Sequence, residues 1–232
     1  MNLRIVLVEP EYEQNIGYCA RVMKNFGFSN LWIVNPKVKI GEDAIKYSKH
    51  AVDILRNAKL TKSLDHATKG CELIVGTTAI KGTGRTILRN AIAPHELKLP
   101  KNSAILFGRE GTGLTPKELE LCDIVVRIPA NESYPTLNIS HALAVILYEL
   151  CKKNAEQDLL HESIGANEKH IIQKLFDLIV DSSKGIRSPS TVKLAFRRII
   201  ARGIKSPIEG RALLQILKNV VYNSYRKRQT EK

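Results

Sequence analysis

The stretch FGREGTGLTPKEL, from Phe107 to Leu119, decides how the first part of the chain is interpreted. Three glycines follow an apolar run and precede a helical pattern, which is typical of a strand that ends in a ligand-binding loop. A dinucleotide-binding loop needs its third glycine three residues after the second, whereas Gly111 and Gly113 are two residues apart. A triphosphate-binding loop ends in Gly-Lys-Ser or Gly-Lys-Thr, but Leu114 follows Gly113. Because neither phosphate pattern fits, the ligand must be inferred from the rest of the chain.

Around this loop, short apolar runs alternate with helical stretches from Leu3 to about residue 155. This alternation predicts an α/β fold with a mostly parallel sheet and helices on its faces. The expected strands span residues 4–8, 31–34, 73–77, 104–107 and 124–128. Expected helices span 15–26, which stops at Gly27, and 139–150. The second helix is apolar almost all the way round, so we expect it in the core or in a subunit interface.

The pattern changes after Lys153. Residues 156–167 are polar and predict a linker, and three helices follow near 168–182, near 190–202 and from Ser206 onward. Ser206, Pro207 and Glu209 have the spacing of a capping box with proline at the first helical position. We therefore divide the chain into an α/β domain at 1–155, a linker at 156–167 and a small all-α extension at 168–232.

The charge of the chain points to a polyanionic partner. Its 36 lysines and arginines exceed its 23 acidic residues by 13, which favours nucleic acid first and an anionic membrane surface second. From residue 156 onward, 15 basic and 8 acidic residues contribute +7 of that excess. Arg197, Arg198 and Arg202 belong to a basic cluster around the turn between the last two helices, for which a solvated helical hairpin is the alternative interpretation.

Other features exclude several classes of protein. No segment has 18 consecutive apolar residues and the first residues run directly into a strand pattern, so we expect a soluble, cytoplasmic protein without a membrane segment. The four cysteines are scattered, without a Cys-x-x-Cys pair or a histidine at metal-ligand spacing. We expect buried free thiols and no metal site.

Two further motifs accompany the glycine loop. In the first, Asn15 lies where a helix cap is expected, and Gly17, Arg21 and Lys24 share one side of the helix. A small Gly17 would let another chain approach there. In the second, residues 128–142, a polar loop with two prolines leads into the apolar helix. Its hydroxyl and amide side chains could be helix caps, yet a loop this polar must fold against something.

The three motifs, at residues 15–21, 107–114 and 128–142, resemble in their order the signature motifs of the SpoU branch of the SPOUT methyltransferases. The resemblance covers about 155 residues. The string Phe-Gly-Arg-Glu-Gly-Thr-Gly-Leu and the helical extension further resemble the TrmJ group, which methylates the ribose 2′-hydroxyl of tRNA nucleotide 32, with cytidine as the expected base. The resemblance implies a homodimer, a C-terminal trefoil knot in the α/β domain and S-adenosylmethionine as cofactor.

The resemblance also assigns residues. It implies a cofactor pocket lined by Thr77, Thr78, Gly108, Gly111, Ile128, Thr136, Leu137 and Asn138. The catalytic residues it implies are Arg21, Asn15, Glu110, Thr136 and Asn138, although the family motif often has serine where Thr136 stands. The residues expected to contact RNA are Lys24, Arg197, Arg198, Arg202 and Arg85, the last of which lies in a glycine-containing basic loop that could also be a disordered surface loop.

Arginine is a poor base because its pKa exceeds 12, so we expect Arg21 to orient the 2′-hydroxyl and stabilise charge on its oxygen, in the pocket of the partner subunit. Asn15 would position Arg21 or a phosphate. Ribosomal RNA as the substrate of the same chemistry is one alternative. The others are a nucleotide-binding module without transfer activity and a non-catalytic DNA-binding protein that uses the last two helices as a helix-turn-helix.

Overall fold

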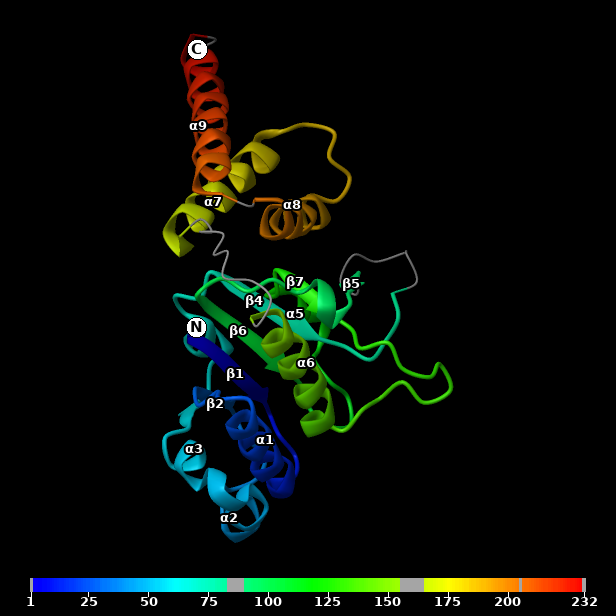
Figure 1. Ribbon diagram of the computed structural model, residues 1–232. Coiled ribbons are helices and arrows are strands. Elements are labelled where there is room, and N and C mark those ends of the chain that lie inside the picture. Colours follow the sequence, from blue (N-terminus) through cyan, green and yellow to red (C-terminus); the bar gives the residue numbers. More distant parts are fainter. Residues whose placement is uncertain (1, 83–89, 155–164, 205, 231–232) are drawn as a thin grey trace. The chain divides into compact units, whose positions relative to one another are not determined.

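The structure is a computed structural model that describes residues 2–82, 90–154, 165–204 and 206–230. The chain divides into two compact units, Met1–Leu159 and Leu160–Lys232, and each is treated by itself. The first unit contains the sheet, and the described residues of the second are helices and their connections (Figure 1).

Seven strands form one sheet in the order β3-β2-β1-β6-β4-β7-β5, and all neighbouring strands are parallel. The central strand β1 pairs with β2 on one side and with β6 on the other, so that Ile5 lies between Leu31 and Ile105. In chain order the strands are β1 (Asn2–Val8), β2 (Leu31–Val34), β3 (Lys59–Thr61), β4 (Leu73–Thr77), β5 (Ala91–Ile92), β6 (Asn102–Phe107) and β7 (Ile124–Val126).

The five predicted strands are all present, and the predicted parallel sheet is confirmed. The two edge strands, β3 and β5, were not predicted. Both are very short, and β3 exposes two of its three residues, so neither produces an apolar run. Short edge strands are common because they limit unwanted pairing with other chains.

Helices cover both faces of this sheet. On one face, Val6 and Leu106 belong to a cluster with Ala67 and Leu119, from α4 (Leu64–Thr68) and α5 (Pro116–Glu120). Alternate side chains point to the other face. The helices α1 (Glu13–Asn25) and α6 (Ile139–Asn154) pack together there. The shorter α2 (Glu42–Ser48), η1 (Lys49–Ala51), α3 (Val52–Arg56) and η3 (Pro94–Glu96) complete the unit.

Gly17 is buried beneath α2 and does not lie on the open side of α1. A Cβ atom at this position would be 2.4 Å from the carbonyl oxygen of Ala44. The segment that approaches Gly17 is therefore α2 of the same chain, and the expectation that another chain approaches there is wrong. The exposed side of α1 contains Arg21 and Lys24.

The predicted apolar helix is α6, and in the single chain one side of this helix is buried while the other side is exposed. Leu143, Ile146 and Leu147 are buried, whereas Val145 and Tyr148 are exposed. All four cysteines are free thiols; Cys19 and Cys122 are buried and the other two are half-buried. Burial, and after it the charge of Glu110, raises the pKa of the Cys19 thiol.

The second unit contains α7 (Ala166–Ser182), α8 (Pro189–Gly203) and α9 (Pro207–Thr230). Their core includes Ile172 and Ile200, and the rings of Phe176 and Phe196 stack with centroids 3.6 Å apart. The predicted capping box of the last helix is confirmed, since Glu209 N donates to Ser206 Oγ at 3.3 Å and Ser206 N donates to Glu209 Oε2 at 2.9 Å. None of the helices in the described part of the chain has the length and apolar character needed to cross a membrane.

Gly17→Ala should destabilise the α/β unit by about 1–3 kcal/mol, because the new methyl group collides with backbone that cannot move cheaply. The single tryptophan, Trp32, lies in β2, so its fluorescence during urea unfolding reports on this unit alone. Gly203→Ala, in the helical unit and with no atom within 4 Å of its new Cβ, is the control. An unchanged Trp32 transition in Gly17→Ala would contradict the tight α1–α2 contact.

Candidate active site at the carboxyl edge of the sheet

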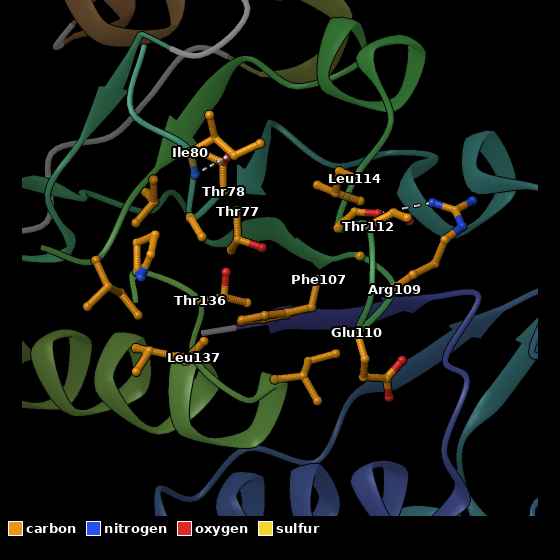
Figure 2. Close-up of a pocket in the computed structure, with 18 of the residues that line it drawn as sticks. Thr77, Thr78, Ile80, Phe107, Arg109, Glu110, Thr112, Leu114, Thr136 and Leu137 are labelled. Atoms are coloured by element: carbon orange, nitrogen blue, oxygen red, sulfur yellow. Dashed lines mark hydrogen bonds between the residues drawn. The ribbon is translucent and has the colours of Figure 1, made fainter. Parts of the chain in front are cut away.

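A pocket opens where β4, β6 and β7 end, which is the edge at which open parallel sheets bind ligands. Three segments line it: the residues after β4, the glycine loop after β6 and the loop before α6. In Figure 2, Leu137 lies on the opposite side of the pocket from Ile80. The lining residues are Thr77–Ile80, Phe107–Leu114, Val126, Ile128, Pro135, Thr136, Leu137, Ile139, Ala142 and Ile146.

The three glycines of the glycine loop (residues 108–114) have different roles. A Cβ on Gly108 would lie 2.1 Å from the carbonyl carbon of Gly113, so only glycine lets the loop close on itself. Gly113 has φ +69°, in the left-handed region that glycine tolerates. Gly111 has room, since the nearest atom to a Cβ there is Glu11 Oε2 at 3.6 Å.

Three backbone amides of this loop donate hydrogen bonds within the protein. Arg109 N donates to Gly113 O at 3.2 Å, Gly113 N donates to Arg109 O at 2.9 Å, and Gly111 N donates to Glu11 Oε2 at 3.1 Å. A phosphate-binding loop points such amides at its ligand. This loop also presents the Glu110 carboxylate next to the pocket, so a phosphate is a poor ligand here.

Arg109 fixes the loop through two carboxylates. Its Nη1 and Nη2 donate to both oxygens of Glu118 at 3.0 and 2.9 Å, and its Nε donates to Glu9 Oε2 at 3.1 Å. Glu118 also closes the capping box of α5 with Thr115. Hydrogen bonds from Lys37, Arg109 and Asn35, in that order of strength, lower the pKa of Glu9 to about 2. Arg109 therefore ties the glycine loop to α5 and to the end of β1.

Asn15 joins the three sequence motifs. Its Nδ2 donates to Glu110 Oε1 at 2.9 Å, and its Oδ1 accepts from Asn138 Nδ2 at 2.9 Å. Glu110 Oε2 accepts from the backbone N–H of Glu11, also at 2.9 Å. The expectation that Asn15 caps α1 is wrong: Tyr12 is the N-cap, and Asn15 is a buried residue of the first turn.

Asn138 ends the loop before α6. Its Oδ1 accepts from Ser140 N at 2.9 Å and from Ser140 Oγ at 2.8 Å, so it caps α6 while its amide reaches Asn15. Leu137 and Thr136, respectively one and two residues before Asn138, line the pocket (Figure 2). Together with Pro135, three consecutive residues of this loop line the pocket, and the next residue, Asn138, anchors the loop to α1.

The model of the SpoU rRNA Methylase family matches residues 2–148. Over 226 residues the chain is 34% identical to the tRNA (cytidine-2′-O-)-methyltransferase TrmJ of Methanocaldococcus jannaschii. The aligned region covers 93% of this chain and 98% of that relative. The chain belongs to the SpoU methylase family. The SpoU resemblance predicted from the three motifs is confirmed.

Solved structures share the fold of this SpoU-family chain. TrmJ from Z. mobilis ZM4 superimposes with a TM-score of 0.69 at 24% identity, over 95% of this chain and 99% of that one. The SpoU methyltransferase AviRb from Streptomyces viridochromogenes, in complex with AdoMet, gives a TM-score of 0.56 at 20% identity, over 67% of this chain and 62% of that one. These likenesses support the α/β fold with a helical extension.

In this SpoU-family chain, most of the residues predicted to bind cofactor line the pocket: Thr77, Thr78, Gly108, Gly111, Ile128, Thr136 and Leu137. Asn138 is not among the lining residues and instead bonds to Asn15. Of the predicted catalytic residues, Glu110 and Thr136 line the pocket. Asn15 does not line the pocket but donates a hydrogen bond to Glu110. Arg21 is exposed on α1, outside the pocket lining.

The residues predicted to bind RNA have different environments. Lys24 is exposed, but its Nζ contacts Asp53 Oδ1 at 2.7 Å. In α8, Arg202 is exposed, Arg197 is half-buried and Arg198 is buried with 4% exposure, which makes Arg198 an unsuitable phosphate contact. Arg85 lies outside the described residues.

Two features of the site have no signal in the sequence: the hydrogen bonds of Arg109 to Glu9 and Glu118, which we call the Arg109 clamp, and the bond from Gly111 N to Glu11. The spacing of Thr115 and Glu118 is typical of a capping box, but this spacing does not indicate that the Glu118 carboxylate also accepts hydrogen bonds from Arg109. The apolar wall of Ile80, Leu114 and Ile146 was missed too, because apolar residues there look like ordinary core. No group of three metal-ligating side chains occurs among the residues that the structure describes.

Acid should weaken the clamp through Glu9. Because the pKa of Glu9 is lowered to about 2 from an ordinary value of 4.5, its contribution to stability is complete above about pH 5 and is lost as the pH falls toward 2. Between pH 6 and pH 2.5, the wild type should therefore lose on the order of 1–2 kcal/mol more than Glu9→Gln, measured by Trp32 fluorescence in urea. Glu120→Gln, which replaces an exposed glutamate of α5, should follow the wild type. Equal acid sensitivity of wild type and Glu9→Gln would refute the ion pairs of Glu9 with Lys37 and Arg109.

Asn15→Asp should destabilise the α/β unit by about 2 kcal/mol at pH 7, because it replaces the donor to Glu110 with a second carboxylate of nearly the same shape. The loss should shrink in acid, where one of the two carboxyl groups takes up a proton. Asn15→Ala, which removes the bond without adding charge, should lose stability at both pH values. If Asn15→Asp and Asn15→Ala responded alike to pH, charge repulsion at Glu110 would be excluded.

Proposed function

We propose that this SpoU-family chain transfers a methyl group from S-adenosylmethionine to a ribose 2′-hydroxyl of tRNA. The observation that carries the proposal is the pocket at the carboxyl ends of β4, β6 and β7, which two of the family's three motifs line and the third anchors. The similarity to the Methanocaldococcus jannaschii tRNA methyltransferase, over nearly the full length of both chains, supports tRNA as the substrate.

The pocket fits a cationic nucleoside better than a phosphate. Three amides of its glycine loop are used within the protein and the loop carries the negative charge of Glu110, while apolar side chains such as Ile80, Leu114 and Leu137 can contact an adenine ring. Thr136 offers a hydroxyl group, and the hydroxyl of Thr77, which donates to Leu106 O at 2.9 Å, can still accept a hydrogen bond. When bound, S-adenosylmethionine supplies an electrophilic methyl group on a sulfonium. We assign its binding to Thr77, Thr78, Gly108, Gly111, Ile128, Thr136 and Leu137, with Asn138 holding the loop.

Arg21 is our candidate for the residue that orients the 2′-hydroxyl and stabilises charge on its oxygen. It follows Asn15 by six residues, which is about 9 Å along the helix axis, and it is exposed outside its own pocket. We therefore propose a homodimer in which Arg21 serves the partner's pocket. The exposed apolar residues Val145 and Tyr148 on α6 are the surface that we expect the dimer to cover.

We further propose nucleotide 32 of the anticodon loop as the target, with cytidine as the base, and the helical unit as an additional tRNA contact. Arg202 supports that contact because it is exposed on α8, and the half-buried Arg197 lies on the same helix. Because Asn15 ties α1 to Glu110 and Asn138, both the pocket and the helix that contains Arg21 are held by the same hydrogen bonds.

The decisive experiment incubates the full chain with labelled S-adenosylmethionine and unmodified tRNA and maps methylated ribose by mass spectrometry. We expect one 2′-O-methyl group at nucleotide 32 and no transfer when that nucleotide is 2′-deoxy. Arg21→Ala should lower kcat by about 10²–10³-fold, whereas Arg56→Ala, an exposed arginine on α3, should not. Equal labelling of the 2′-deoxy tRNA would overturn ribose methylation.

Parallel assays separate the alternatives. Transfer to ribosomal RNA but not to tRNA would establish the rRNA substrate instead. Tight, sequence-specific binding to duplex DNA that ignores S-adenosylmethionine, without methyl transfer, would favour the helix-turn-helix interpretation. Full activity of Arg21→Ala would remove Arg21 from the mechanism.

A further inference from the structure

Two tyrosines meet on the outer surface of α1 and α2. The ring centroids of Tyr18 and Tyr47 are 4.9 Å apart, with planes inclined at 49°. The contact depends on Gly17, whose missing Cβ lets α2 approach α1 within backbone contact. Tyr18 is 37% exposed and Tyr47 is half-buried, so the pair remains accessible on the single chain. It lies outside the pocket lining.

Basic side chains surround the pair. Arg21 follows Tyr18 by three residues and therefore lies one turn along the same side of α1. The Nζ of Lys46 is 5.6 Å from the ring centroid of Tyr47, and the exposed Lys49 follows at the end of α2. We call Tyr18, Tyr47, Arg21, Lys46 and Lys49 the α1–α2 surface.

Nearby acidic groups offset this charge only in part. Asp43 accepts from Gln14 Nε2 at 2.6 Å, and Asp53 is paired with Lys24. Glu13 accepts from the backbone N–H groups of Gly41 and Ala44 at the start of α2. Exposed Glu42 is the remaining carboxylate of α2, against the three cations of the α1–α2 surface.

We propose that the α1–α2 surface binds unpaired nucleotides of the RNA substrate, with a base stacked on Tyr18 and Tyr47 and phosphates at Lys46 and Lys49. Proteins recognise single-stranded RNA by this combination of aromatic faces and flanking cations. The α1–α2 surface belongs to the α/β unit, whereas Arg197 and Arg202 belong to the helical unit. The tyrosine pair lies next to Arg21, so a nucleotide held there is close to the residue to which we assign the 2′-hydroxyl. The inference rests on the proposed function.

The test uses the full chain and measures tRNA affinity at fixed salt, S-adenosylmethionine affinity by calorimetry, and kcat and KM for tRNA. Tyr18→Ala should weaken tRNA binding about 5- to 100-fold and raise KM, with S-adenosylmethionine affinity unchanged. Tyr18→Phe keeps the aromatic face and should bind tRNA nearly as the wild type does. Leu60→Ala removes an apolar side chain from β3 that is more exposed than Tyr18, 61% against 37%, and should have no effect on tRNA binding.

The charge part has its own control. Lys46→Ala should lower the slope of log K against log salt by about one, whereas Lys69→Ala, at the exposed end of α4 on the other face of the sheet, should not. Unchanged tRNA affinity in both Tyr18→Ala and Lys46→Ala would overturn the inference. So would a shift from dimer to monomer in Tyr18→Ala by sedimentation, because the surface would then bind a second copy of the chain.

The outcomes also separate this inference from the proposed function. If the wild type methylates tRNA but Tyr18→Ala and Lys46→Ala bind tRNA normally, the inference about the α1–α2 surface is wrong and the proposed function stands. If the wild type transfers no methyl group yet binds RNA through Tyr18, the proposed function is wrong and the surface stands.

Discussion

The hydrogen-bond chain from Glu110 through Asn15 to Asn138 is the constraint on which the site depends. Asn15 is nearly fully buried, and a buried amide that loses its partners costs about 1–3 kcal/mol for each group left unsatisfied. Its donor and acceptor are both used, one toward the glycine loop and one toward the loop before α6. Any movement of one loop away from the other would break a bond to α1, so the two walls of the pocket keep a fixed separation.

The glycine loop adds a second level of rigidity. Arg109 is held by two carboxylates, and the loop closes through reciprocal backbone bonds that require glycine at position 108. Preorganised loops bind ligands without the entropy cost of ordering. The pocket thus exists as a formed cavity whose shape is set by the chain itself.

The sequence predicted the sheet well because buried parallel strands are continuous apolar runs, as in β1 and β6. It predicted which loops line the pocket, since glycines and polar residues at strand ends are a local signal. It failed at Asn15, where local rules suggested a cap, because the actual partners are 95 and 123 residues away. The environments expected for Gly17 and Arg198 differ from the structure for the same reason. Both residues are buried by packing partners that a local sequence pattern does not identify. The trefoil knot stays a prediction.

These separations along the sequence also determine when the site can form during synthesis. The first strand finds its neighbour β6 only after about a hundred residues, and Asn15 finds Asn138 only when the start of α6 is present. Contacts of such long sequence separation form slowly, and the loops they close must be ordered late. An emerging chain therefore has α1 and its arginine long before it has a pocket, and the last loop to join is the one that completes it.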